Sequence, residues 1–321
     1  MHTAPLVIVT PALASANNGN WQTARRWAAM LRPHYPVEVC TDWTSGDHAA
    51  MLALHARRSA ASVAAWRAAF PTRPLAVVLT GTDLYDDIGH DSHAQQSLDW
   101  ADRLVVLQPM GVQALPAHVR HKAMVCIQSS PPRQRVKKPT RHLRALMVGH
   151  LRAVKSPETW FETARLLRHR PDIRLDHIGD ALDPALGDAA RRCMADCPNY
   201  RWLGALPHAA TRRRIQHAHL LVHASRLEGG AHVVIEAVTS GTPVLASRID
   251  GNLGLLGPDY AGVFEHGDSA ALSTLLQRAR DEPGMLADLA AQCERRAPLF
   301  TPEHEHATLV ALMQSLMETR S

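Results

Sequence analysis

Two glutamates eight residues apart flank a pair of glycines in the C-terminal half of the chain. Glu228 precedes Gly229 and Gly230, and Glu236 lies about two turns into the helix that we expect to follow. The N–H groups at the start of that helix would be free: those of Gly230, Ala231 and His232. Free N–H groups and the helix dipole together attract phosphate. A carboxylate nearby repels phosphate, so we expect the glutamates to bind uncharged hydroxyls of a ribose or hexose. The alternative is a solvated helix after an ordinary glycine-rich turn.

The residues around this motif predict a strand, a tight loop, a helix and a second strand. The apolar runs 220–222 and 243–246 are typical of short buried strands. Apolar residues in 233–238 recur at helical spacing, and Gly241 is a typical helix stop. Such a crossover is right-handed and places its loop at the carboxyl end of the first strand, where parallel sheets bind ligands.

Two further cations follow an apolar strand predicted at the start of the C-terminal half. Arg152 and Lys155 lie in the loop after Gly149, and Ser156 and Pro157 are a typical N-cap and first residue of the next helix. In this position the two cations could neutralise an anionic ligand. A solvated loop is the alternative.

The N-terminal half begins with an apolar strand, 5–10, and a polar loop. Asn20 is a good N-cap for a helix over 21–31, and this strand, loop and helix form the usual place for a ligand in an open α/β sheet. The candidates for ligand binding in this region are Asn17, Gly19, Asn20 and Thr23. A plain connecting loop is the alternative.

A histidine and two arginines follow a second strand of the N-terminal half. His55, Arg57 and Arg58 precede an alanine-rich helix over 60–69. Cations at a helix N-terminus are disfavoured by its dipole, so two of them there indicate a compensating anion. The three residues are therefore candidates for an anion pocket, and ordinary solvated arginines are the alternative.

Composition indicates a two-domain α/β protein. The chain has 321 residues, 46% of them hydrophobic, which is enough for two cores. We expect domains at 1–135 and 141–300, a basic, proline-rich linker over 131–140, and a C-terminal helix in 301–321. The formal charge of +5 suits small anionic substrates, but no basic run with interleaved aromatics indicates nucleic acid.

The cysteine content and the hydropathy of the chain indicate the cellular compartment in which it folds. Five scattered cysteines fit a reducing environment, so we expect a cytoplasmic protein. The N-terminus lacks the pattern of a signal peptide, and no apolar run reaches the roughly 18 residues of a membrane span. Cys193 and Cys197 have no third ligand nearby and are interpreted as structural thiols, so no metal is expected.

The motif Glu228, seven residues, Glu236, then Gly241-Thr242-Pro243-Val244, resembles that of the retaining GT-B glycosyltransferases related to glycogen synthase and sucrose synthase. The resemblance implies two Rossmann-like doubly wound domains facing across a cleft. It implies that Glu236 binds the ribose of a nucleotide and Glu228 the transferred sugar. The N–H groups between them, including those of Gly229, Gly230, Ala231 and His232, would bind the diphosphate.

The same resemblance extends to other loops. Lys155, six residues after Gly149, matches the lysine that neutralises the donor diphosphate, whereas His150 occupies the family's arginine position and Arg152 lies two residues further on. The loop with Gly19 and Asn20 matches one that faces the donor and acceptor. In this family a terminal helix crosses back to the first domain, but a core helix of the second domain would look the same in sequence.

One departure from the family concerns the reaction centre. The strand over 75–80 ends in Gly81, Thr82 and Asp83, and Thr82 occupies the position where many relatives carry a histidine. A threonine is a hydrogen-bond partner and not a base at neutral pH. The acceptor would then be one that needs little deprotonation, such as an ionised selenium or sulfur nucleophile.

Several stretches together resemble the selenosugar synthases of selenoneine biosynthesis. They are LHARRSA (54–60), LTGTDLY (79–85), GHLRAVKSP (149–157), SRLEGGAHVVIEAV (225–238), GTPVLASRIDGNLGLLGPDY (241–260) and RAPLF (296–300). The resemblance implies transfer of glucose or N-acetylglucosamine from a UDP-sugar to selenophosphate, with no metal or other cofactor.

This interpretation assigns a role to each candidate. The catalytic candidates are Lys155, Arg152, Glu228 and Thr82. Those for the acceptor are His55, Arg57, Arg58, Asn17, Thr23 and Asp83. Two alternatives remain: a glycosyltransferase acting on a lipid or sugar hydroxyl, and a nucleotide-sugar-binding module without turnover. Sugar preference, anomeric outcome and oligomeric state stay open.

Overall fold

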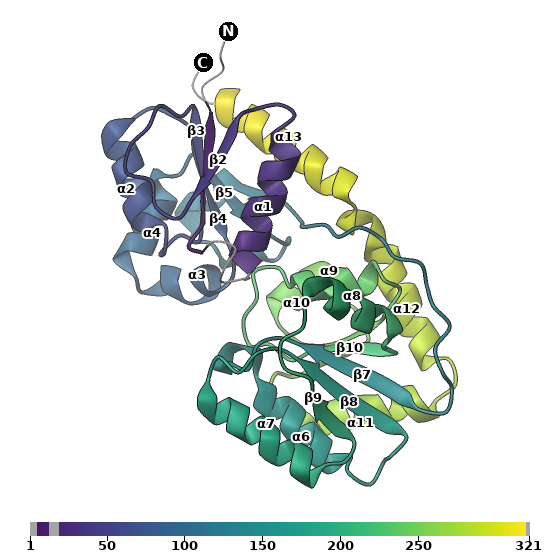
Figure 1. Ribbon diagram of the computed structural model, residues 1–321. Helices are drawn as coiled ribbons and strands as arrows, with labels where there is room; N and C mark the ends of the chain where they lie inside the picture. Colours follow the sequence, from purple (N-terminus) through teal and green to yellow (C-terminus); the bar gives the residue numbers. More distant parts are fainter. Residues whose placement is uncertain (1–4, 13–18, 319–321) are drawn as a thin grey trace. The chain divides into compact units, whose positions relative to one another are not determined.

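The computed structural model describes residues 5–12 and 19–318, which form two compact units (Figure 1). The N-terminal unit contains the described residues of 1–129, together with 228–230 and those of 302–321. The C-terminal unit contains 130–227 and 231–301. The basic segment 131–140 lies with the C-terminal unit, where the Arg133 N–H donates to the Thr239 carbonyl over 2.8 Å.

The N-terminal unit is built on a six-stranded sheet in which every pairing is parallel. The strand order is β2-β1-β3-β4-β5-β6, so the order reverses between β1 and β3. Its strands are β1 (Leu6–Val9), β2 (Val37–Cys40), β3 (Ala50–Leu54), β4 (Leu75–Leu79), β5 (Arg103–Val106) and β6 (Ala123–Val125).

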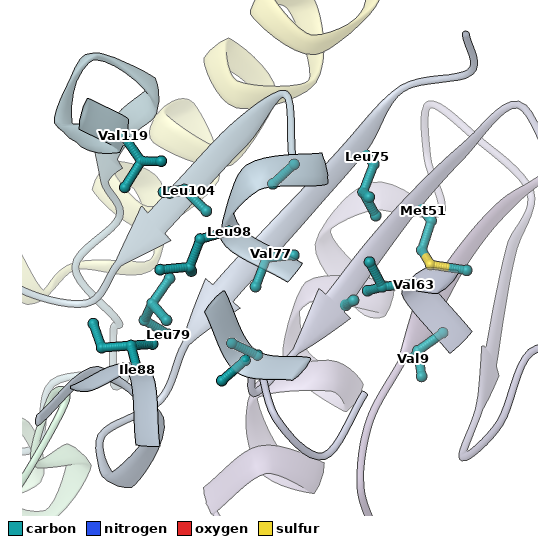
Figure 2. Close-up of a cluster of buried hydrophobic side chains, with 14 of the residues drawn as sticks. Val9, Met51, Val63, Leu75, Val77, Leu79, Ile88, Leu98, Leu104 and Val119 are labelled. Carbon is teal, nitrogen blue, oxygen red and sulfur yellow. The ribbon is translucent and has the colours of Figure 1, made fainter. Parts of the chain in front are cut away.

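Helices cover both faces of this sheet because alternate strand residues point to opposite sides. Val9 and Met51 belong to one buried cluster with Val63, as Figure 2 shows, whereas Leu6 and Leu52 belong to a second. The helices are α1 (Gly19–Leu31), α2 (Ala60–Ala69), α3 (Thr82–Tyr85), α4 (Ser92–Trp100), α5 (Gly111–Ala114) and α13 (Pro302–Glu318), with 3₁₀ turns η2 (Asp87–Gly89) and η3 (Ala117–Lys122).

The C-terminal helix α13 packs on the N-terminal unit, beside α1 (Figure 1). Its apolar residues fill the second cluster of the N-terminal sheet: Leu309, Leu312, Met313 and Leu316. Glu305 is buried near the start of α13. Its two carboxylate oxygens share the Arg26 Nε–H, at 3.0 Å from Oε1 and 2.8 Å from Oε2. Oε1 also accepts a hydrogen bond from the Trp27 indole N–H at 2.7 Å. The Ser129 N–H also donates to Glu305, at the end of this unit's first segment.

Glu305→Gln should lower the free energy of unfolding by about 1–3 kcal/mol, because the amide loses charge-assisted bonds to Arg26 while Arg26 stays half-buried. Urea unfolding followed by circular dichroism measures the change. Glu303→Gln, at an exposed position in the same helical turn, is the matched control and should change stability by less than about 0.5 kcal/mol. Equal effects of both substitutions would contradict a buried ion pair that holds α13.

The C-terminal unit has a second fully parallel sheet. Its order is β12-β11-β10-β7-β8-β9, which reverses between β7 and β10. The strands are β7 (Leu143–Val148), β8 (Ile173–Ile178), β9 (Tyr200–Trp202), β10 (Leu220–His223), β11 (Val244–Ser247) and β12 (Val263–Phe264). The helices are α6 (Pro157–Leu166), α7 (Pro184–Asp196), α8 (His208–His217), α9 (His232–Val238), α10 (Asp250–Leu256), α11 (Ser269–Asp281) and α12 (Met285–Arg296), with turns η4 (Ala153–Lys155) and η5 (Ala297–Phe300).

Two doubly wound parallel sheets confirm the predicted α/β fold class. In such sheets, ligands bind at the carboxyl ends of the strands beside the point where the strand order reverses. In the N-terminal unit that point lies between the loops after β1 and β3, and in the C-terminal unit between the loops after β7 and β10. These loops carry most of the residues singled out by the sequence.

Candidate functional site

The loop after β7 begins at Gly149, whose backbone is fixed from both sides. Its N–H donates to the Ile178 carbonyl over 2.8 Å, and its carbonyl accepts from His177 Nε2 over 3.1 Å. A Cβ on Gly179 would collide with the Gly149 carbonyl, so only glycine fits at 179. The loop that carries Arg152 and Lys155 therefore starts from a rigid base.

His177 supports this loop as a neutral imidazole. Burial lowers its pKa to about 4, although the bond to Gly149 opposes the shift. Because Nε2 must donate to a carbonyl, Nδ1 is the acceptor and takes the hydroxyl hydrogen of Tyr200 over 3.2 Å. No local sequence pattern indicates this contact, because His177 and Tyr200 lie on different strands, β8 and β9.

Lys155 is half-buried and Arg152 is exposed in the same loop. A Cβ on Gly149 would lie 3.4 Å from Lys155 Cγ, so the aliphatic stem of Lys155 runs along Gly149. Ser156 precedes α6 and Pro157 is its first residue, as predicted, but Ser156 does not cap the helix with its side chain. Its backbone is left-handed, with φ of 50°, and its hydroxyl contacts His266 Nε2 at 2.7 Å, which is a correction to the expected N-cap.

The loop after β10 is tied to the loop after β7. The Arg226 N–H donates to the Val154 carbonyl over 2.9 Å. Behind it, buried His223 bonds through Nδ1 to Asn252 Oδ1 at 2.9 Å, and Asn252 in turn donates to the Ser247 carbonyl. The glycine-rich residues after β11 form helix α10.

Glu236 is a buried, ionised carboxylate on α9. The helix begins at His232, so Glu236 lies little more than one turn into it and not about two as expected. It is 4% exposed, and its Oε1 contacts His208 Nε2 at 2.6 Å and His232 Nδ1 at 3.5 Å. Burial by itself raises the pKa of Glu236, but the hydrogen bonds from His208 and His232 outweigh burial and bring it to about 2.

Arg212 completes the surroundings of Glu236 and was not found from the sequence. Its Nη1 lies 3.8 Å from Glu236 Oε1, and it also donates to the Ser130 hydroxyl and to the Pro131 carbonyl. Arg212 and His208 belong to α8, whose spacing to α9 is not encoded in any local pattern. Within the described residues, every contact of the Glu236 carboxylate goes to Oε1.

Glu228, Gly229 and Gly230 are grouped with the N-terminal unit, and the glycines have little room. A Cβ on Gly229 would lie 2.5 Å from the Thr80 carbonyl carbon, and one on Gly230 would lie 2.7 Å from Leu107 Cβ. Ala231 is the N-cap residue of α9 and has no side-chain cap. Among the described residues, none accepts a hydrogen bond from the N–H groups of Gly230 and Ala231.

His55 and Thr82 contact each other in the N-terminal unit. His55 is buried, adopts a left-handed backbone with φ of 73°, and its Nε2 lies 3.1 Å from Thr82 Oγ1. The Arg58 N–H donates to His55 Nδ1 over 3.3 Å, so Nε2 carries the hydrogen of the neutral ring. Burial lowers the pKa of His55, Arg58 lowers it further, and Asp83 and Asp87 oppose the shift. The Thr82 hydroxyl therefore accepts from His55 and keeps its own hydrogen for another partner.

Asp83 is fully buried and acts as a brace. Its Oδ1 accepts the N–H groups of Thr80 and Gly81, each at 2.8 Å, and its Oδ2 accepts the Ala56 N–H at 2.9 Å. The carboxylate thus holds the loop after β4 to the loop after β3. This arrangement positions Thr82 and His55 and occupies both carboxylate oxygens of Asp83.

The two arginines after β3 have different surroundings. Arg57 is exposed but pairs with Asp87 at 3.1 Å and with Asp91 at 3.1 Å. These carboxylates supply the compensating charge that the sequence argument assigned to a bound anion. Arg58 is also exposed, and its guanidinium forms no ion pair with any residue that the structure describes.

The first loop of the chain contributes less than its sequence suggested. Asn17 lies outside the described residues. Helix α1 begins at Gly19, so Asn20 is inside the helix and is not its N-cap. Thr23 is buried, donates to the Gly19 carbonyl at 2.9 Å and accepts from Gln128 Nε2 at 2.6 Å, so its hydroxyl is engaged within the unit.

The described part of the chain contains neither a candidate metal-binding cluster nor a candidate membrane-spanning helix. Its histidine, cysteine, aspartate and glutamate residues form no group of three that could hold a metal ion. None of its helices has both the length and the apolar character needed to span a bilayer.

The loop after β7 thus carries a lysine and an arginine, and the helix that follows β10 carries an ionised glutamate. Over residues 130–298, more than half of the chain, the sequence matches the family model described as "Glycosyl transferases group 1". The chain belongs to the group 1 glycosyltransferases. The match covers the C-terminal unit and both of these segments.

Two curated proteins are similar to this group 1 glycosyltransferase. Glycosyltransferase 1 domain-containing protein 1 of Xenopus tropicalis is 25% identical over 60% of the chain and 61% of its own length. D-inositol 3-phosphate glycosyltransferase of Streptomyces avermitilis is 28% identical over 52% of the chain and 39% of its own length. The chain therefore spans less than two thirds of the length of either relative.

A solved structure shows the fold of the whole group 1 glycosyltransferase. Anabaena HepE, in complex with UDP and glucose, superposes with a TM-score of 0.76 at 14% identity. The likeness covers 98% of this chain and 100% of HepE. It confirms the predicted GT-B fold class, with its two Rossmann-like domains.

Proposed function

We propose that this group 1 glycosyltransferase transfers a hexose, glucose or N-acetylglucosamine, from a UDP-sugar to selenophosphate. The observation that carries the donor half of the proposal is the C-terminal switch point, where Lys155 and Arg152 follow β7 and ionised Glu236 follows β10. Family membership supports a sugar donor, and the complex of HepE with UDP and glucose supports UDP as its carrier.

In this proposal the donor is bound through charge and hydroxyl contacts. Lys155 and Arg152 neutralise the diphosphate, and the N–H groups of Gly230 and Ala231 donate to it. Glu236 is ionised, and its Oε2 is the acceptor proposed for the ribose hydroxyls. Glu228 binds the hexose hydroxyls. No metal enters the scheme, because the protein's cations meet the diphosphate.

The acceptor half rests on His55, Thr82 and Arg58. Since His55 Nε2 donates to Thr82, the pair has no base at this point and offers the Thr82 hydroxyl as a donor. Selenophosphate is already anionic and needs no deprotonation. Attack of a selenium lone pair on the anomeric carbon forms the C–Se bond, while the C–O bond to the diphosphate breaks and its electrons leave with UDP.

Arg58→Ala should raise the KM for selenophosphate about tenfold or more, because one charge-assisted contact to its phosphate is lost. Arg57→Ala should have a smaller effect, since Asp87 and Asp91 already pair with Arg57. Steady-state rates with each substrate varied in turn measure both KM values, and the KM for the UDP-sugar should change less than twofold. Arg32→Ala, an exposed position on this unit, is the control. Equal losses for both substrates would contradict an acceptor role for Arg58.

The product identifies the reaction. Purified protein is incubated with selenophosphate and a panel of UDP-sugars, and products are analysed by mass spectrometry for a selenium isotope pattern on a hexose. UDP release with selenophosphate and the matching selenosugar mass would support the proposal. UDP release with hydroxyl acceptors only would overturn it.

A hydroxyl acceptor on a lipid or sugar is the second candidate. The two ion pairs of Arg57 favour it, because they leave Arg58 as the unpaired arginine of the predicted anion pocket. The same panel with sugar and lipid alcohols distinguishes the two reactions. A nucleotide-sugar-binding module without turnover would release no UDP with any acceptor.

A further inference from the structure

A cavity lies at the end of the C-terminal sheet that is opposite to the candidate site, toward the amino ends of β7, β8 and β9. Its volume is about 290 Å³. The residues that matter for its chemistry are Arg144, Arg168, Arg174, Arg201, Asp176 and Asn199. Arg144 is the second residue of β7 and Arg174 the second of β8, so the cavity is separate from the loops at the carboxyl ends of these strands.

The arginines of this cavity are incompletely neutralised. Arg144 and Arg174 are register partners on β7 and β8, and like charges directly opposite each other destabilise a sheet. Asp176 is the single carboxylate in the lining, and it pairs with Arg201 at 3.0 Å and with Arg144 at 3.6 Å. Arg168 and Arg174 form no ion pair with any residue in the described part of the chain. The lining thus has four guanidinium groups and one carboxylate, and this excess of positive charge favours binding of an anion.

Two buried polar atoms of the lining residues form no hydrogen bond with the described residues. Asn199 is 8% exposed and donates through Nδ2 to the Leu167 carbonyl at 3.0 Å, but its Oδ1 accepts no hydrogen bond. Arg144 Nε is buried and donates no hydrogen bond. Both atoms are shielded from solvent, and Arg144 Nε lies 3.6 Å from Asp176 Oδ2, so recognition of a ligand in this cavity falls to the guanidinium groups.

We propose that this cavity binds a small phosphorylated sugar or polyol. The phosphate would lie between Arg144, Arg168 and Arg174, whose planar guanidinium groups match its oxygens. A volume of about 290 Å³ is at the lower end for ligand pockets and fits one monosaccharide phosphate.

Titration calorimetry with glucose 6-phosphate and with inorganic phosphate as probes tests the site. Both titrations use the full chain carrying Lys155→Met, so that the proposed donor loop contributes little to binding. Glucose 6-phosphate should bind more tightly than phosphate, because its sugar fills the cavity beside the arginines. Arg174→Gln and Arg168→Gln should each weaken binding of glucose 6-phosphate about tenfold or more.

Arg192→Gln, an exposed arginine on α7 outside the cavity, is the matched control and should bind like the parent. In phosphate-free buffer, Arg174→Gln should melt at the same or a higher temperature than the parent, because a like-charge pair is removed. Glucose 6-phosphate should raise the Tm of the parent more than that of Arg174→Gln. Equal affinities for Arg174→Gln and Arg192→Gln, or no binding heat with either probe, would overturn the proposal.

Discussion

Replacing Lys155 with methionine should lower kcat/KM for the UDP-sugar by about 10²- to 10³-fold and leave the fold intact. The ammonium group is the cation that we place on the leaving diphosphate, where negative charge grows as the bond to the sugar breaks. Methionine keeps most of the stem that lies along Gly149, so packing in the loop after β7 is preserved. The loss should appear mainly in kcat, because the contact strengthens in the transition state.

Initial rates of UDP release over a range of donor concentrations measure the effect. Lys137→Met, in the exposed basic segment before the C-terminal sheet, is the matched control and should leave the rates unchanged. Melting temperatures of both variants should stay close to that of the parent. An unchanged kcat for Lys155→Met would show that Lys155 does not act in catalysis, whichever acceptor the enzyme uses.

Much of the fold could be predicted, because buried parallel strands appear in the sequence as short apolar runs. The helix predicted over 60–69 agrees with α2 to the residue, and the C-terminal helix predicted within 301–321 is α13. Strand β2 was missed, since Val37–Cys40 is a short edge strand without a fully buried residue. Helix α10 is not apparent from the sequence, because its glycines have low helix propensity and tertiary packing overrides that preference.

The contacts within the candidate site were much less predictable. Arg57 meets Asp87, 30 residues away, and Glu236 meets His208, 28 residues away. Neither pair has a spacing that a helix or strand would bring together, so only the tertiary fold reveals them. The exception is His232, which contacts Glu236 one helical turn later, because residues four apart lie on the same face of a helix.

Glu236→Gln should raise the KM for the UDP-sugar about tenfold or more and lower the free energy of unfolding by about 3 kcal/mol at pH 7. The amide keeps the size of the side chain but removes the charge that faces Arg212 and His208. Arg212 is itself buried, so losing its carboxylate leaves a guanidinium without full compensation. Donor titrations and urea unfolding measure the two effects on the same protein.

The stability difference should depend on pH in a defined direction. The pKa of Glu236 falls from 4.5 to about 2 on folding, so its contribution to stability is fully present above pH 4.5 and is lost as pH falls toward 2. The difference between the parent and Glu236→Gln should therefore be largest near pH 7 and shrink through this interval. Glu162→Gln, at an exposed position on α6, is the control for removing a surface carboxylate.

The two readouts of Glu236→Gln separate a structural role from a binding role. If Glu236 only neutralises Arg212, unfolding should change while the donor KM stays constant in the folded fraction. If its Oε2 binds the ribose hydroxyls, the KM should rise at pH 7 even in conditions where the variant is fully folded. A deoxyribose form of the UDP-sugar should then discriminate further, because it should bind the parent more weakly than the natural donor but bind Glu236→Gln about equally.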